Sequence, residues 1–199
     1  MPRVVFLTHP QVVVDPAVPV PGWGLSEVGR ARAAALAGGA WLRDVASVWS
    51  SDERKAIECA DLLAGALPRQ RHTGLGENDR SATGFVPPAE FEALADAFFA
   101  EPSRSVRGWA TAADEQERIV AAVEDVLADP ASGDGDVVIV SHGAVGTLLW
   151  CALSGVPIAR AYDQPGQGHF YTFDRDTRRV LSGWRPLDEV AGQGDESGR

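Results

Sequence analysis

The chain has 199 residues and a net charge of -10, because 18 Lys and Arg residues face 28 Asp and Glu residues. This length is enough for one α/β domain with a sizeable core and too short for two such domains. Nucleic-acid binding requires a basic face, whereas the only lysine is Lys55, so we expect no nucleic-acid partner.

The composition also bears on location. No stretch approaches the roughly 20 apolar residues that a membrane span needs. The first residues run straight into a strand pattern and lack the regions of a signal peptide. Cys59 and Cys151 fall within helix-like patterns and are interpreted as reduced packing thiols. We therefore expect a cytoplasmic protein that binds no membrane, and the oligomeric state, a homodimer included, stays open.

Short apolar runs alternate with amphipathic segments along the chain. The expected strands cover residues 3–8, 45–49, 69–73, 137–140, 170–174 and 180–184. The expected helices run from an N-cap at Ser26 through Val28 to Trp41, from caps at Ser50, Ser51 and Asp52 to Ala64, and over residues 88–100, 114–128 and 144–153. This alternation predicts a three-layer α/β/α fold with a mainly parallel central sheet.

The predicted domain comprises residues 1–188. Within it, residues 74–109 form a variable loop and helical cap, because the loop at 74–88 is long for a simple connection. Residues 189–199 are rich in Gly, Asp, Glu and Ser and are expected to form a flexible tail.

Two histidines follow the two clearest strand patterns. Ligands of a parallel sheet bind outside the carboxyl ends of its strands, where His9 and His142 are expected to lie. One such histidine alone is more often structural, but the pair favours a functional site. His72 and His169 lie in weaker strand patterns and are assigned structural or surface roles.

Five short segments in register resemble a known family. They are Thr8-His9-Pro10, Leu25-Ser26-Glu27-Val28-Gly29, Ser50-Ser51-Asp52-Glu53-Arg54-Lys55-Ala56, Leu75-Gly76-Glu77 and Val140-Ser141-His142-Gly143. Their order resembles the histidine phosphatase superfamily, also called phosphoglycerate mutase-like proteins, whose pattern is Arg-His-Gly, Leu-Ser-x-x-Gly, Ser-Ser-x-x-x-Arg-Ala, Leu-x-Glu and Ser-His-Gly. The resemblance covers nearly the whole chain and implies the phosphoglycerate mutase-like fold.

The resemblance implies a role for each matching residue. His9 would be the nucleophile and form a phosphohistidine, with its Nδ1–H held by the Pro10 carbonyl so that Nε2 faces phosphorus. His142 would stabilise the transferring phosphoryl oxygens, and Glu77 would protonate the leaving oxygen. Such a reaction uses no metal and no organic cofactor, and its substrate would be a small phosphorylated molecule or another anionic ligand.

The departures from the pattern bear on the activity. Thr8 stands where the family has its first arginine, and Lys55 stands at the second. Arginine grips two phosphoryl oxygens with a planar fork, which neither residue offers. Losing one such donor costs on the order of 10²–10³ in rate, so weakened phosphatase activity is expected. Asp15 aligns with a family asparagine, and Arg80 is predicted as a replacement cation that binds substrate together with Thr8 and Lys55.

Other readings remain beside a phosphatase. A degenerate member could bind a ligand or a protein partner without turnover, and a mutase is disfavoured because family mutases tend to carry an insertion that this chain lacks. A metal site on His9 and His142 lacks further ligands at useful spacing. The motifs of a serine hydrolase elbow and of a P-loop are absent. Trp23 and Trp109 flank loops and could line a pocket for an organic substrate.

Overall fold

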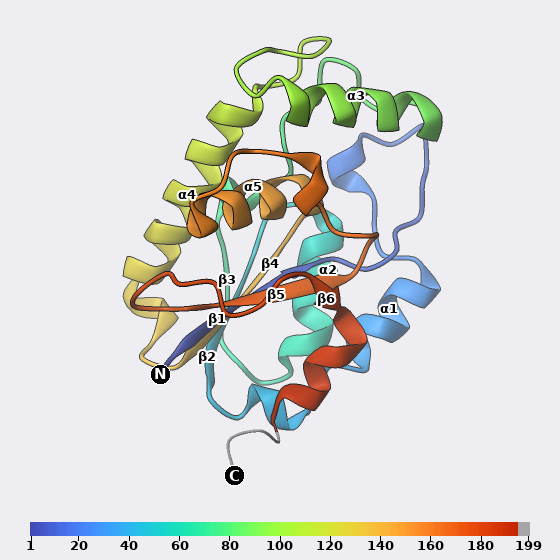
Figure 1. Cartoon of the computed structure of the whole chain (residues 1–199). Helices are drawn as coiled ribbons and strands as arrows, with labels where there is room; N and C mark the ends of the chain where they lie inside the picture. Colours follow the sequence, from blue (N-terminus) through green and yellow to red (C-terminus); the bar gives the residue numbers. More distant parts are fainter. Residues whose placement is uncertain (195–199) are drawn as a thin grey trace.

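The computed structural model describes residues 1–194 and has a six-stranded sheet between two layers of helices (Figure 1). The strands lie in the order β3-β2-β4-β1-β5-β6. The first four are parallel to one another, β5 is antiparallel to β1, and β6 is antiparallel to β5. The strands are β1 (Arg3–Thr8), β2 (Val45–Ser50), β3 (Arg69–Arg71), β4 (Asp136–Ser141), β5 (His169–Asp174) and β6 (Arg185–Pro186). The predicted three-layer, mainly parallel fold is confirmed.

The described residues form five α-helices. They are α1 (Glu27–Ala34), α2 (Arg54–Ala64), α3 (Pro88–Ala100), α4 (Ala112–Ala128) and α5 (Gly143–Ser154). Of these, α3 lies beyond the edge of the sheet in Figure 1. Side chains of a strand alternate between its faces, so Val4 and Phe6 belong to the core cluster on the side of α4 and α5, whereas Val5 and Leu7 belong to the core cluster on the side of α1 and α2. Both faces of the central strands are thus buried, which explains their unbroken apolar runs.

The strand ends that matter for function meet at one edge. Thr8 at the end of β1 pairs with Ser141 at the end of β4, and Ser50 at the end of β2 pairs with Val140. The residues that follow these ends therefore emerge side by side. The register alone brings His9 and His142 into one place.

The first predicted helix is shorter than expected. Ser26 is its N-cap, as predicted, and accepts a hydrogen bond from the Gly29 N–H at 3.1 Å. The helix ends at Ala34, Trp41 lies in a separate 3₁₀ turn, and Val28 is 61% exposed instead of buried. Alanines supplied most of the apparent apolar period, and they mark no particular face.

Two further local predictions are wrong. The N-cap of α2 is Glu53 instead of a residue at 50–52, and its side chain makes no capping hydrogen bond. Residues 180–184 form no strand, since Val180 makes only an isolated bridge to Phe173 and the next pairing is β6. The N–H groups of residues 181 and 182 both point to the Thr172 carbonyl, at 2.8 and 3.3 Å, which interrupts the ladder.

The first residues of the segment predicted as a flexible tail belong to the folded domain. Glu189 and Val190 belong to a 3₁₀ helix, Leu187–Gly194, and Val190 is 1% exposed in the core beside α1 and α2. The prediction was wrong there because one valine and one leucine carry the packing in a polar stretch. Residues 195–199 lie outside the described part of the chain.

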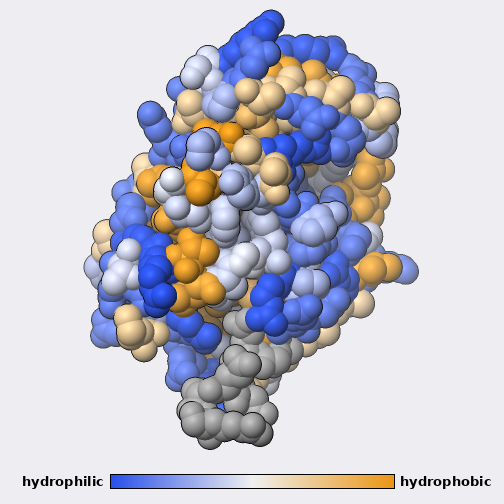
Figure 2. Space-filling view, viewed as in Figure 1, coloured by the Kyte–Doolittle hydropathy of each residue, from blue (hydrophilic) through white to orange (hydrophobic). Residues whose placement is uncertain are grey.

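The character of the surface and the burial of the two cysteines match the expectations from the composition. On the face shown in Figure 2, hydrophobic residues form small groups among hydrophilic ones. No helix within residues 1–194 is long and apolar enough to cross a bilayer. Cys59 and Cys151 are free and buried, and burial raises the pKa of the Cys59 thiol to about 12, which keeps it protonated and unreactive.

Candidate active site

His9 follows β1 and is held by its own neighbour. Its Nδ1 lies 2.9 Å from the Pro10 carbonyl oxygen. A carbonyl only accepts hydrogen bonds, so Nδ1 carries the proton and Nε2 has a free lone pair. Burial lowers the pKa of His9 to about 4, against the opposing effect of the Pro10 hydrogen bond. The imidazole is therefore neutral at pH 7 and has the tautomer of a nucleophile through Nε2.

His142 follows β4 and contacts the first histidine. The two ring centroids are 5.2 Å apart with an interplanar angle of 67°, so the rings touch edge to face. Nε2 of His142 lies 2.8 Å from the Ser51 hydroxyl and 3.3 Å from Oε1 of Glu53. The ionised carboxylate can only accept, so Nε2 carries the proton, and the buried Nδ1 has no partner. Burial lowers the pKa of His142, which is consistent with a neutral ring.

Glu77 lies on a loop next to the N-terminus of α5. Its Oε1 accepts from the Asn78 N–H at 3.1 Å and from the Val145 N–H at 3.3 Å. Burial raises the pKa of Glu77 against the opposing charge of Arg80, and the nearby Glu53 carboxylate adds to the rise. A carboxyl group with a raised pKa is suited to donate a proton.

Two side chains of α4 hold the loop that carries Glu77. Arg118 donates to the carbonyls of Gly74, Gly76 and Glu77, at 2.6, 3.0 and 3.1 Å. It also pairs with Glu115, whose Oε1 accepts from the Asp79 N–H at 2.9 Å. The position of Glu77 therefore depends on a helix more than thirty residues further along the chain.

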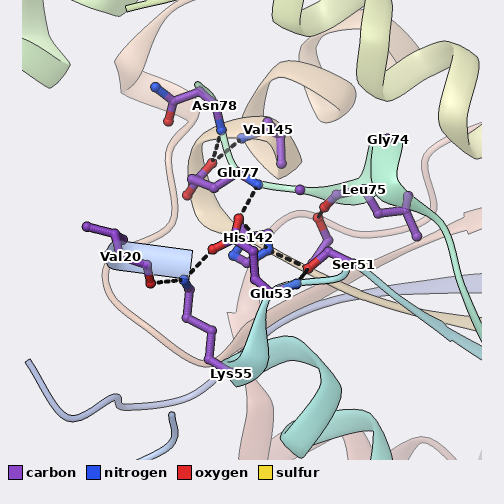
Figure 3. Close-up of polar contacts among 12 residues, drawn as sticks. Val20, Ser51, Glu53, Lys55, Gly74, Leu75, Glu77, Asn78, His142 and Val145 are labelled. Atoms are coloured by element: carbon purple, nitrogen blue, oxygen red, sulfur yellow. Dashed lines mark hydrogen bonds and ion pairs between the residues drawn. The ribbon is translucent and has the colours of Figure 1, made fainter. Parts of the chain in front are cut away.

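Glu53 and Lys55 form a buried ion pair within the site (Figure 3). The Lys55 side chain is 4% exposed and the Glu53 side chain 12%. The ammonium also donates to the Val20 carbonyl at 3.0 Å. Burial alone would raise the pKa of Glu53, but the Lys55 ammonium and the hydrogen bond from the Glu77 N–H stabilise the carboxylate and lower its pKa. Glu53 is thus a carboxylate at every physiological pH.

Thr8 has a different environment from the one predicted for it. It is 1% exposed, and its hydroxyl donates to Oε1 of Gln164 at 2.7 Å and accepts from the His169 N–H at 3.0 Å. The amide of Gln164 in turn lies against Gly143, where a Cβ would meet Nε2 at 2.4 Å. The donor and one acceptor position of the Thr8 hydroxyl are engaged with Gln164 and β5. These contacts do not support the substrate-binding role predicted for Thr8.

A cavity of about 350 Å³ opens next to these groups. One side consists of Pro19, Val20 and Pro21, and the other of Glu53, Gly84 and the loop from Glu77 to Ser81. Arg80 lines this cavity, and its guanidinium lies over the Phe91 ring at 4.9 Å from the centroid. Trp109 is 2% exposed and packs in the core, so it does not line the cavity as the sequence suggested.

The structure brings five of the six predicted residues to one site. Glu77 and Arg80 line the cavity, His9 and His142 contact each other, and beyond the effect of burial the charges of Lys55 and Arg80 lower the pKa of His9. The sequence spacing indicated no further metal ligand near the two histidines. In the structure, by contrast, the Glu53 carboxylate lies 3.3 Å from Nε2 of His142. Within residues 1–194, however, no three His, Cys, Asp or Glu side chains form a group that could hold a metal ion.

Sequence reasoning missed several residues. Glu53 lay inside a matched segment, at one of the positions that the pattern leaves open, and its charge two residues before Lys55 was the signal available. Gln164 and Arg118 gave no signal, because both act through contacts with residues more than forty positions away.

Comparisons with known proteins agree with this geometry. The family model described as histidine phosphatase superfamily, branch 1, matches residues 18–180. The match begins after His9, so the assignment of His9 rests on its position and hydrogen bond. No curated protein matches the sequence significantly.

Solved structures give the same result. Mycobacterial glucosyl-3-phosphoglycerate phosphatase is 26% identical with a TM-score of 0.71, over 92% of this chain and 96% of that chain. Its complex with inorganic phosphate gives 26% identity and a TM-score of 0.73 over 93% and 95%. Bacillus stearothermophilus YhfR, at 18% identity, has a TM-score of 0.74 over 96% of this chain and 100% of that chain, which shows the shared fold.

Proposed function

The chain belongs to the histidine phosphatase superfamily, and on this premise we propose that it hydrolyses a small phosphorylated metabolite through a phosphohistidine on His9. The observation that carries the proposal is the 2.9 Å contact between Nδ1 of His9 and the Pro10 carbonyl. It fixes the tautomer in which Nε2 can attack, and burial keeps that nitrogen unprotonated at pH 7.

The proposed reaction has two steps. Nε2 of His9 attacks phosphorus, the bond to the leaving oxygen breaks, and the Glu77 carboxyl gives that oxygen its proton. Water then attacks the phosphohistidine, Glu77 takes a proton from the water, and the P–N bond breaks to restore neutral His9. The raised pKa of Glu77 supports the first step, and its contact with the α5 N-terminus keeps the group in place for the second.

The substrate class follows from the relatives. Glucosyl-3-phosphoglycerate is a phosphorylated metabolite, and the phosphatase named for it shares 26% identity over nearly the whole chain. The cavity of about 350 Å³ has room for a ligand of small-metabolite size. Arg80 is the cation on the cavity wall that is proposed to meet the substrate's negative charge.

Hydrolysis of p-nitrophenyl phosphate tests the proposal. We expect activity in the native protein and loss of at least about 10³ in kcat for His9→Ala, because the nucleophile itself is removed. His169→Ala is the matched control, since the His169 ring lies near the surface and its Nδ1 makes a hydrogen bond with the Gly166 carbonyl. Rapid quenching should reveal a phosphorylated His9 by mass spectrometry. Equal activity in the native protein and His9→Ala would remove His9 from the mechanism.

A second candidate function is ligand binding without turnover. The observation that favours it is the ion pair of Lys55 with Glu53, together with the engaged hydroxyl of Thr8. Both reduce the positive charge available to a transferring phosphoryl group. Binding of inorganic phosphate without any hydrolysis of several phosphomonoesters would favour this function over the first.

A further inference from the structure

The Glu53 carboxylate is bound in the site much as a small anion would be. Its Oε1 accepts from the Glu77 N–H at 2.8 Å and lies 3.3 Å from Nε2 of His142, while Oε2 accepts from the Lys55 ammonium. Figure 3 shows these donors converging on the one carboxylate. A backbone amide, an imidazole N–H and an ammonium are the kinds of donor that oxyanion sites use.

These donors are also the ones that a substrate would need. The Thr8 hydroxyl is engaged elsewhere, whereas the His142 ring contacts His9 and Lys55 lies close enough for its charge to act on His9. Glu53 accepts from the Lys55 ammonium and lies 3.3 Å from Nε2 of His142, which also meets the Ser51 hydroxyl at 2.8 Å. Glu53 also lines the cavity, whereas His142 is fully buried and His9 is 8% exposed. An oxyanion entering from the cavity therefore meets a carboxylate before it meets either histidine.

We propose that Glu53 is an internal competitor for the oxyanion site, whose carboxylate must leave Lys55 and His142 before a phosphoryl group can bind. It thereby sets the affinity of the protein for oxyanions. The proposal rests on the proposed function for the identity of the competing group, a phosphoryl oxyanion.

The position of Glu53 allows such a movement. It is the N-cap of α2, with extended backbone angles of φ -75° and ψ 136°, and its side chain satisfies no helix amide. The side chain can therefore rotate towards the cavity without breaking a helix hydrogen bond. Protonation does not release it at neutral pH, because its pKa is about 2. Competition by another anion remains as the way to displace it.

Binding of orthovanadate and of inorganic phosphate, measured by titration calorimetry, tests the proposal. Glu53→Gln keeps the side-chain size and one accepting oxygen, which can serve either the Glu77 N–H or the Lys55 ammonium, but removes the charge. We expect it to bind both anions at least about tenfold more tightly than the native protein, because a like charge is removed from the site. Asp52→Asn removes the same charge one residue earlier, on an exposed side chain, and should change the affinity less than about twofold. Equal or weaker binding by folded Glu53→Gln would overturn the proposal.

A crystal structure of the native protein with orthovanadate provides a second test that needs no variant. Vanadate oxygens should contact Lys55 and His142, with the Glu53 carboxylate rotated into the cavity. Vanadate bound while Glu53 stays on Lys55 would overturn the proposal, even if Glu53→Gln fails to fold. Neither measurement depends on turnover. If Glu53→Gln binds the anions more tightly but the native protein hydrolyses no phosphomonoester, the proposed function alone is refuted. If hydrolysis depends on His9 but Glu53→Gln leaves the anion affinity unchanged, this inference alone is refuted.

Discussion

Arg118→Met tests how the Glu77 loop is held. The substitution keeps the aliphatic packing and removes three hydrogen bonds to the carbonyls of the loop, together with the counterion of Glu115. The Glu115 side chain is 4% exposed, so the variant leaves a buried carboxylate whose remaining partner is the Asp79 N–H. Breaking a buried pair in this way costs about 3–5 kcal/mol.

The expected loss is smaller than that range, because Arg118 is 32% exposed and water can replace part of its contacts. We expect a loss of about 2–3 kcal/mol in the free energy of unfolding, read from urea denaturation. Arg104→Met is the matched control. Its pair with Glu101 has side chains 73% and 54% exposed, and such pairs contribute about 0–1 kcal/mol.

Enzymatic activity is the second measurement on Arg118→Met. If Arg118 positions Glu77, Arg118→Met should lower kcat more for an alkyl phosphate than for p-nitrophenyl phosphate, because the alkoxide needs the proton that Glu77 gives. Equal losses of stability in Arg118→Met and Arg104→Met would refute the reasoning about the buried pair. An unchanged ratio of the two rates would refute the positioning of Glu77.

Three further predictions concern protonation and the C-terminal segment. Log kcat/KM should fall on the acid side near pH 4, where His9 gains a proton, and Glu77→Gln should abolish the decline at higher pH that follows loss of the Glu77 proton. The pKa of His9 is lower in the folded protein than its usual 6.5, so the unfolded chain binds more protons between pH 6.5 and about 4. The free energy of unfolding should therefore decrease as the pH falls through this window, and it should decrease less in His9→Asn. Val190→Ala should cost about 1–3 kcal/mol in urea denaturation and Val28→Ala less than about 0.5, since the first valine is 1% exposed and the second 61%; similar losses would show that Val190 does not pack.

The sheet and the meeting of the two histidines could be predicted from the sequence. Unbroken apolar runs such as residues 137–140 identify central strands, and the strand-end rule then places His9 and His142 together. The start of α1 at Ser26 was also predictable, because a capping hydrogen bond acts over three residues. Local signals and one general rule of sheet architecture were sufficient for these features.

Other features depend on contacts between distant segments. Residues 180–184 are predicted as a strand from the sequence, but the N–H groups of Leu181 and Ser182 both donate to one carbonyl of β5, and only the assembled sheet edge decides this. Val190 is buried because a core face lies nearby, not because its own segment is apolar. The pairing of Lys55 with Glu53 was equally hidden, because two charges at this spacing usually both face solvent.

The chain of contacts from Thr8 through Gln164 to Gly143 constrains how these positions can change. An arginine at position 8 would take away the hydroxyl that orients the Gln164 amide, and it would need the space beside β5. The amide in turn lies where a Cβ at position 143 would be. Positions 8 and 164 should therefore change together, so that among relatives an arginine at position 8 is accompanied by a residue other than glutamine at position 164.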